Sequence, residues 1–278
     1  YVRSNCGDGV LGTWKGPFTF TTATVVPSPW FEGFVTSTMP VGFFVSGLDL
    51  TNSVTSNPGS DGYFYRQNLD STGEKAILST VNVGPILTGD VFSFDYSLRN
   101  WSSAGATPEG QASFIIELST DFGNTYTTIG EFLNDCNPDW IRFEYPLGSY
   151  VGQIVKIRIT VERLAGDYYI GLDNFYIGSC PMPNVPQVAN STMNSVLLEW
   201  VALPTDAFEI EYGPIGFVQG TGTVLVATGS SINITGLTES TQYEYYIRRK
   251  CSDTNFSPRM GKFKFMTSCA VLAIFYTS

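Results

Sequence analysis

Short runs in which apolar and polar residues alternate make up most of the C-terminal third of the chain. From residue 181 onward the runs are SVLLEW, AFEIEYG, TVLVA, SINITGL, YEYYIRRKC and KFKFMT, separated by turn-forming residues. A period of two places successive side chains on opposite faces of a strand, and no helical periodicity intervenes. The pattern predicts a small antiparallel β-sandwich over residues 181–268.

A second series of strand-like runs fills residues 23–180. The runs include AILST, VFSFDYSLRNW, ASFIIELST, YTTIGEF, WIRFEYPL and VKIRITVER. This many strands in one block indicates a jelly roll or a related double sheet. The chain as a whole is therefore predicted to be all-β.

The first 22 residues repeat a later segment of the chain. Residues 1–22 align without gaps with residues 246–267, and eight of the 22 positions are identical, among them Cys6 with Cys251. Both segments read as a strand ending in cysteine, a polar turn, and a strand with a Phe-x-Phe alternation. We expect residues 1–22 to be the last hairpin of a truncated domain, and residues 269–278 to begin a following segment of a longer repeat-containing protein.

The residues of the C-terminal block resemble those of a fibronectin type III domain. The resemblance rests on a tryptophan that closes one strand, a tyrosine on the next, a leucine before a Tyr-x-Tyr strand, and the final Phe-x-Phe strand: Trp200, Tyr212, Leu237, Tyr243 and Tyr245. More narrowly, EYGPIGFVQGTGT followed by ITGLTESTQYEYYIRRKC resembles the fibronectin-type repeats of Bacteroidetes surface and secreted proteins. The resemblance implies a fibronectin-type β-sandwich in an exported bacterial protein.

The larger block, residues 23–180, resembles MAM-like and cleaved-adhesin-like jelly rolls. Those domains carry a Phe-Glu-like step in the first strand and a Leu-Asp-(Asp/Asn)-hydrophobic step in the last, and Phe31-Glu32 and Leu172-Asp173-Asn174-Phe175 occupy these places here. The four-cysteine pattern of animal MAM domains is absent, which favours the bacterial relatives. Together the two resemblances imply an adhesin-like protein exported through the type-nine secretion system.

The chain has five cysteines, and the resemblance to a fibronectin-type sandwich suggests one pairing. In that fold the first strand begins at the pole where the sixth strand ends, so we expect a disulfide between Cys180 and Cys251. By the same rule Cys6 and Cys269 would have partners outside the chain, and Cys136 has no assigned partner. Reduced, buried thiols are the alternative. A disulfide implies an oxidising compartment, outside the cell or at its surface.

Composition and charge exclude several classes of function. The net charge is −10, and only 15 Lys and Arg residues are scattered along the chain, whereas nucleic-acid binding requires a clustered basic face. No apolar run approaches the length of a membrane span.

The chain has no histidine, which removes Ser-His and Cys-His nucleophiles and His-ligated zinc. Paired carboxylates remain open, but no spacing selects two of Glu117, Glu131, Glu144 and Glu162. We expect no enzymatic activity.

Two acidic residues are candidates for a structural calcium site. The jelly-roll resemblance places Glu32 and Asp173 on neighbouring terminal strands, so their carboxylates would meet there. Calcium takes six to eight oxygen ligands, and backbone carbonyls near Asp61 or Gly33 would complete the set. In related carbohydrate-binding jelly rolls such a site is structural. Two solvated carboxylates, or an ordinary turn, are the alternative.

Aromatic residues in loops or at strand ends are candidates for ligand binding. A flat ring can stack on a sugar or anchor a protein contact. We select Trp101, Trp140 and Tyr168, with Trp101 in RNWSS and Trp140 in CNPDW as the most exposed because polar turn residues flank them. Packing in the core is the alternative for each.

STDFGNTY, residues 119–126, matches the Asp-box hairpin motif of sialidase propellers, where the motif is structural. It occurs once here, so we expect a β-turn in which Asp121 and Asn124 bond backbone groups and Gly123 takes a positive φ.

The function predicted from the sequence is a non-catalytic adhesion, binding and spacer region of a secreted or cell-surface bacterial protein. Expected partners are glycans or cell-surface proteins, the secretion machinery during export, and neighbouring domains of the same chain. A carbohydrate-binding accessory region of a secreted hydrolase is one alternative, and an adhesin region of a secreted protease is another.

Overall fold

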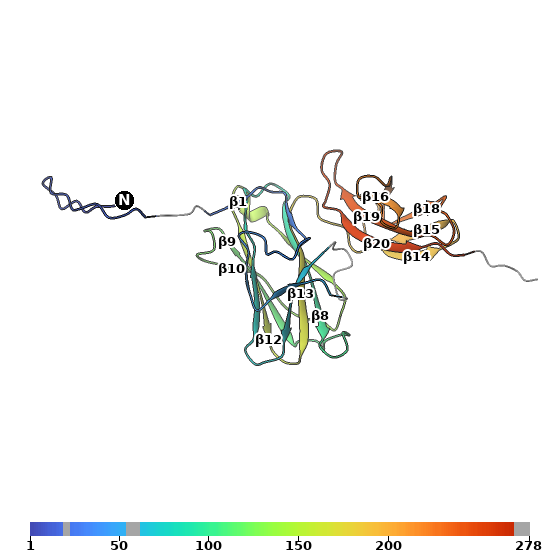
Figure 1. Ribbon diagram of the computed structural model, residues 1–278, viewed down its shortest axis with the longest axis horizontal. Coiled ribbons are helices and arrows are strands. Elements are labelled where there is room, and N and C mark those ends of the chain that lie inside the picture. The colour runs from blue at the N-terminus through green and yellow to red at the C-terminus, as the bar shows by residue number, and fades with distance from the viewer. Residues whose placement is uncertain (19–22, 54–61, 270–278) are drawn as a thin grey trace, which may run out of the picture.

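The computed structural model describes residues 1–18, 23–53 and 62–269, and these fold into two β-sandwiches preceded by a hairpin (Figure 1). The prediction of an all-β chain is confirmed. Within the described residues there is a single short 3-10 helix, Gly148–Tyr150, and no helix is long and apolar enough to cross a membrane.

The larger sandwich consists of two antiparallel sheets, and the chain crosses between them repeatedly, as in a jelly roll. One sheet has the order β10 (Thr127–Leu133), β9 (Ala112–Ser119), β12 (Lys156–Arg163), β6 (Lys75–Ser79), β3 (Phe44–Ser46). The other has the order β11 (Ile141–Pro146), β8 (Val91–Asn100), β13 (Tyr168–Gly178), β5 (Phe64–Leu69), β4 (Asp49–Thr51), and β2 (Trp30–Glu32) also pairs with β13. Two short strands, β1 (Val25–Val26) and β7 (Asn82–Val83), form a parallel pair at one end.

The core of the larger sandwich lies between these two sheets and follows the period of two in the sequence. Along β12, for example, Ile157, Ile159 and Val161 are fully buried while the residues between them are partly exposed. Opposite them, Phe94 of β8 and Phe175 of β13 stack with ring centroids 5.7 Å apart. Stacked and edge-on aromatic pairs of this kind add to the free energy gained from burial.

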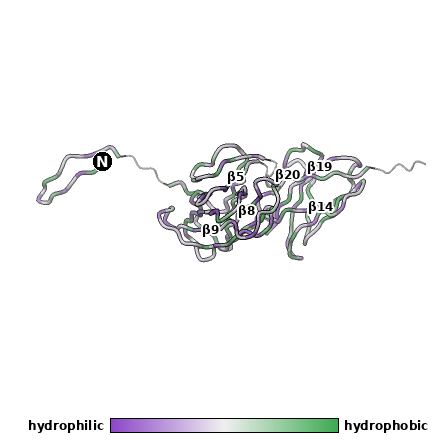
Figure 2. Tube along the Cα trace, turned by 90° about the horizontal axis from the view of Figure 1, so that it is seen from below, coloured by the Kyte–Doolittle hydropathy of each residue, from purple (hydrophilic) through white to green (hydrophobic). Residues whose placement is uncertain are grey.

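The smaller sandwich has the strand order of a fibronectin-like fold. Its three-stranded sheet is β14 (Gln187–Ser191), β15 (Ser195–Glu199), β18 (Ser231–Thr235), and its four-stranded sheet is β17 (Thr223–Thr228), β16 (Ala207–Pro214), β19 (Gln242–Lys250), β20 (Met260–Met266). Trp200 lies in the core, edge-on to Phe208 with centroids 5.2 Å apart. Figure 2 shows hydrophobic and hydrophilic positions intermixed along the chain in both sandwiches.

Residues 1–18 form a two-stranded hairpin that lies outside both sandwiches (Figure 1). Val2 pairs with Lys15 and Asn5 with Leu11 in antiparallel bridges, and the turn between them contains Cys6. The last four residues of the predicted hairpin 1–22, and all but Cys269 of the predicted segment 269–278, lie outside the described residues.

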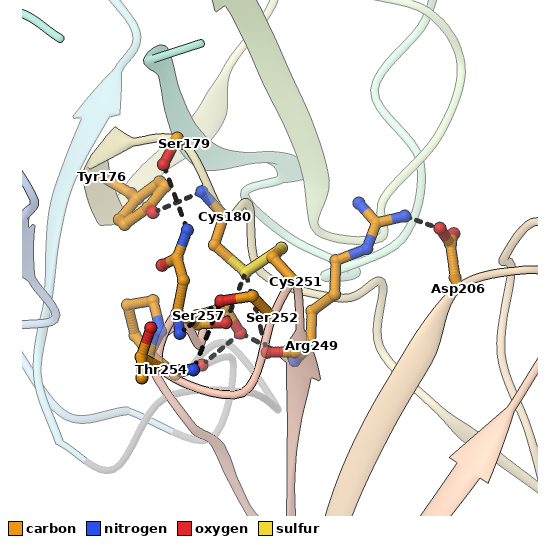
Figure 3. Close-up of a disulfide and its surroundings, with 11 residues drawn as sticks. Tyr176, Ser179, Cys180, Asp206, Arg249, Cys251, Ser252, Thr254 and Ser257 are labelled. Atoms are coloured by element: carbon orange, nitrogen blue, oxygen red, sulfur yellow. Dashed lines mark hydrogen bonds and ion pairs between the residues drawn. A yellow bond between two sulfur atoms is a disulfide. The ribbon is translucent and has the colours of Figure 1, made fainter. Parts of the chain in front are cut away.

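A disulfide joins the end of the larger sandwich to the smaller one. Cys180 follows β13 and Cys251 follows β19, and their sulfur atoms are bonded with Cα atoms 5.8 Å apart (Figure 3). Hydrogen bonds surround this link: the Cys180 N–H donates to the Tyr176 hydroxyl at 3.1 Å, and the Asn255 amide donates to Ser179 at 3.2 Å. Cys6, Cys136 and Cys269 are free and exposed.

Candidate functional site

The outer face of the sheet that contains β8, β13 and β5 carries the candidate ligand-binding residues. Residues paired across antiparallel strands share a face of the sheet. Gly171 of β13 lies opposite Ser97 of β8 and Arg66 of β5. Tyr169, two residues before Gly171 and on the same face of β13, lies opposite Arg99 of β8. Because the alternate residues of these strands fill the core, this row faces away from it.

The Trp140 indole packs directly against this face because Gly171 has no side chain. A Cβ atom at Gly171 would lie 2.7 Å from Cη2 of Trp140, closer than packed side chains approach, so only glycine leaves room for the indole. Phe64 of β5, itself buried, meets the indole edge-on with centroids 5.4 Å apart. The indole is half-buried and therefore forms part of the surface.

A cleft of about 470 Å³ lies beside Trp140, between the two sandwiches. The larger sandwich lines it with Asp95, Arg99, Asp139, Trp140 and Arg142. The smaller sandwich and the segment that enters it line it with Asn184, Val185, Gln187 and Val201. A second hollow of about 410 Å³ shares Arg142, Asn184 and Val201 with the first. We name the surface formed by the cleft and the Gly171 row the Trp140 cleft.

Arg142 fixes the two walls of the Trp140 cleft relative to each other. Its guanidinium binds the Asp95 carboxylate through two nitrogens at 2.8 and 3.0 Å, and Nη1 donates to the carbonyls of Met182 and Pro183 at 2.9 and 3.0 Å. The side chain of Arg142 is 9% exposed and that of Asp95 is 5% exposed. Tyr176, on the outer face of β13, packs into the core of the smaller sandwich. The cleft is therefore a fixed feature of the junction.

The three aromatic residues selected from the sequence lie in different environments. Trp140 lines the cleft, whereas Trp101 is exposed in the loop after β8. The backbone N–H of Trp101 donates to the Asp167 carbonyl at 3.2 Å. The expectation for Tyr168 is corrected here: its side chain is 0% exposed, lies in the core and donates to the Gln111 carbonyl at 3.1 Å. Its neighbour Tyr169 is the residue that faces outward.

The predicted calcium ligands lie on paired strands. Glu32 of β2 is opposite Phe175 of β13, and a β-bulge at Asn174, which has a φ of 50°, separates this pair from Asp173. The Glu32 carboxylate accepts a hydrogen bond from the Phe34 N–H at 2.8 Å. Burial raises the pKa of Glu32 by more than this hydrogen bond lowers it. The fully buried Asp173 accepts from the Asn174 N–H at 2.8 Å.

These two carboxylates supply a minority of the six to eight oxygens that calcium takes. Among residues 1–18, 23–53 and 62–269, no three acidic, cysteine or histidine side chains converge on one point. Asp61, considered with them from the sequence, lies outside the described residues. Calcium binding at Glu32 and Asp173 therefore stays a prediction, with backbone carbonyls and water as the remaining ligands.

The Asp-box segment forms the expected turn. Asp121 accepts from the Thr125 N–H at 2.9 Å and the Thr125 hydroxyl at 2.7 Å, and the Asn124 side chain donates to the Asp121 carbonyl at 2.6 Å. Gly123 has a φ of 91°. The hydrogen bonds from Thr125, followed by that from Ser119, lower the pKa of Asp121 to about 2. The motif has a structural role here.

No protein-family model and no curated protein matches this chain. Among solved structures, the chain is similar to a computationally redesigned β-sandwich protein, at 21% identity over 34% of this chain and 98% of that one, with a TM-score of 0.28. It is also similar to the fn3 domain of the human collagen alpha-1(XX) chain, at 15% identity over 35% of this chain and 94% of that one, with a TM-score of 0.29. The glycoside hydrolase domain of Endo-D from Streptococcus pneumoniae R6 is similar at 13% identity over 81% of this chain and 37% of that one, with a TM-score of 0.38. Similarity at this level says nothing about activity or ligand.

Proposed function

We propose that this chain is a non-catalytic binding and spacer region of a secreted or cell-surface bacterial protein, and that it binds glycans in the Trp140 cleft. The observation that carries the proposal is the Trp140 indole, which is held over Gly171 at the mouth of a cleft that also contains guanidinium, carboxylate and amide groups. Sugars bind to proteins through the combination of a flat apolar ring and convergent polar groups.

The junction between the sandwiches supports the spacer role. The Cys180–Cys251 disulfide, the buried Arg142–Asp95 pair and the packing of Tyr176 all connect the larger sandwich to the smaller one. Linked domains without such contacts move relative to each other. A chain that presents a ligand-binding face at a fixed angle to its neighbour suits an adhesin or a targeting module.

The disulfide is compatible with an extracellular location. The Bacteroidetes origin and the export through the type-nine secretion system are part of the proposal, and they rest on the resemblance of the sequence. Two of the four glutamates considered for catalysis are engaged in ion pairs, Glu117 with Arg158 at 2.7 Å and Glu162 with Lys75 at 3.0 Å, which favours binding over catalysis.

A glycan-array screen of the full chain tests this proposal. The Trp140→Ala variant is compared with the wild type and with Trp14→Ala, which removes an exposed ring from the hairpin outside both sandwiches. We expect wild type and Trp14→Ala to bind the same glycans and Trp140→Ala to lose them. Gly171→Ala, which displaces the indole without deleting it, should weaken the same binding. Binding that persists in a folded Trp140→Ala protein would move the site elsewhere, and no binding by the wild type would contradict the proposal.

A further inference from the structure

Two arginines border the Trp140 cleft and differ from most other arginines of the chain. Arg142, Arg158, Arg248, Arg249 and Arg259 each have a carboxylate within ion-pair distance. Among the described arginines, Arg3, Arg66, Arg99 and Arg163 have no such partner, and of these only Arg66 and Arg99 share a surface. In a chain of net charge −10, these are two guanidiniums on one face that form no ion pair among the described residues.

Arg66 and Arg99 face the same shallow hollow from opposite sides of β13. Seven residues line this hollow: Phe64, Arg66, Ser97, Arg99, Trp140, Tyr169 and Gly171. The two arginines stand on the strands that flank β13, and neighbouring strands lie about 4.8 Å apart. The Trp140 indole covers Gly171 and borders the same hollow as both arginines, so a ligand group placed against the exposed part of the indole is within reach of both guanidiniums.

Both guanidiniums are held in place before a ligand arrives. Arg66 lies over the Tyr169 ring at 4.5 Å and its Nη1 donates to Ser53 at 3.3 Å. Arg99 donates from Nε to Ser97 at 3.3 Å and from Nη1 to the Ala104 carbonyl at 3.4 Å. Within the described residues these bonds leave Nη2 of each arginine available. A planar guanidinium fixed in this way is suited to carboxylate recognition, because little side-chain entropy is lost on binding.

The positions of the nearby acidic residues determine the orientation in which a ligand would bind. Asp95 is neutralised by Arg142, and Asp49 lies opposite Arg66 in the ladder at the solvent-exposed edge strand. Asp139 is exposed and lines the cleft together with Trp140. A carboxylate such as Asp139 repels an anionic group but accepts hydrogen bonds from sugar hydroxyls. The anionic end of a ligand therefore belongs at Arg66 and Arg99 and its hydroxyl-rich end at Asp139.

We infer that the Trp140 cleft takes a carboxylate-bearing saccharide, with the sugar ring on Trp140 and the carboxylate between Arg66 and Arg99. This inference rests on the proposed function, because it presupposes that a glycan binds in the cleft. It adds the chemical class of the ligand and two specificity-determining residues.

Isothermal titration calorimetry on the full chain tests the inference. The probes are uronic-acid and sialic-acid oligosaccharides, each with its carboxyl-reduced, neutral counterpart. The variants are the double substitution Arg66→Gln, Arg99→Gln, the substitution Trp140→Ala, and the control Lys156→Gln, which removes one positive charge from the outer face of the other sheet.

We expect an acidic oligosaccharide to bind the wild type at least about tenfold more tightly than its neutral counterpart. The double arginine variant should lose about 10- to 100-fold in affinity for the acidic form, as for the loss of hydrogen bonds between charged groups. It should lose less affinity for the neutral form, which has no carboxylate to bind the guanidiniums, so the preference for the acidic form should disappear. The control should behave as the wild type, and Trp140→Ala should lose both ligands. Added salt should weaken only the acidic ligand.

Two results would overturn the inference, and they differ in what they leave standing. Equal binding of neutral and acidic forms, with no effect of the double variant, refutes the acidic ligand and leaves a glycan-binding cleft. Absence of binding for every probe by the wild type, together with a silent glycan array, refutes the proposed function and the inference with it.

Discussion

Removal of the disulfide between Cys180 and Cys251 should destabilise the smaller sandwich strongly. The bond connects residues 71 apart in the sequence, so the loop that it closes is essentially the smaller sandwich. In the chain-entropy model, a loop of this length lowers the entropy of the unfolded chain by about 15 cal/mol/K, or about 4 kcal/mol at 25 °C. The perturbation is the double substitution Cys180→Ala, Cys251→Ser, chosen because Cys180 is buried and Cys251 is exposed.

The assay is calorimetric and denaturant unfolding of the full chain, with Cys136→Ser as the matched control that removes an exposed free cysteine. One kcal/mol shifts the melting temperature of a domain of this size by roughly 4–8 °C, so the transition of the smaller sandwich should fall by roughly 15–30 °C. Fluorescence of Trp200, the one tryptophan in residues 181–268, assigns the transition. The transition of the larger sandwich should change little. A loss below about 1 kcal/mol in the smaller sandwich would show that the disulfide does not stabilise it by restricting the unfolded chain.

Three further perturbations test other parts of the account. Arg142→Met should destabilise the junction by about 3–5 kcal/mol in urea unfolding, because it leaves the Asp95 carboxylate buried without its cation. Adding Asp95→Leu should recover much of this loss, and an unchanged stability of Arg142→Met would show that the pair is unimportant. Calcium should raise the melting temperature of the wild type and a chelator should lower it, whereas Glu32→Gln should respond to neither; a wild-type melt unmoved by both would contradict the calcium prediction. Hydrogen bonds lower the pKa of Asp121 to about 2, so its contribution to stability is present above the unfolded-state pKa near 4 and is lost as the pH falls toward 2. Asp121→Asn should therefore remove this part of the acid sensitivity, measured as the melting temperature against pH. An identical acid profile in the variant would refute that assignment.

The alternation of apolar and polar residues was sufficient to predict both sandwiches, because each strand buries one face. The same rule could have placed Tyr168 correctly: it stands in phase with Ile170 and Leu172, which point into the core, so Tyr169 had to face outward. A position in a loop or at a strand end suggested exposure for Tyr168, and the phase of the strand overrides it.

The binding surface itself could not be derived from single strands. Trp140, Gly171 and Arg66 are far apart in the sequence and meet only through the pairing of β5 with β13, of β13 with β8, and of β8 with β11, which Trp140 directly precedes. The sequence contains no signal for this register, since the glycine that makes room for the indole looks like any other glycine in a strand. Trp140 was found because of its polar neighbours, and its partners required the structure.

The position of the ligand on Trp140 can be observed directly by NMR. In a sample labelled with ¹⁵N at its five tryptophans, each indole N–H gives one resonance, and the Trp140→Phe variant assigns that of Trp140. On titration with a glycan that the wild type binds, the account predicts that the Trp140 resonance shifts and saturates with the ligand while that of Trp14 stays fixed. Saturable binding that leaves the Trp140 resonance unmoved and shifts that of Trp101 instead would contradict it.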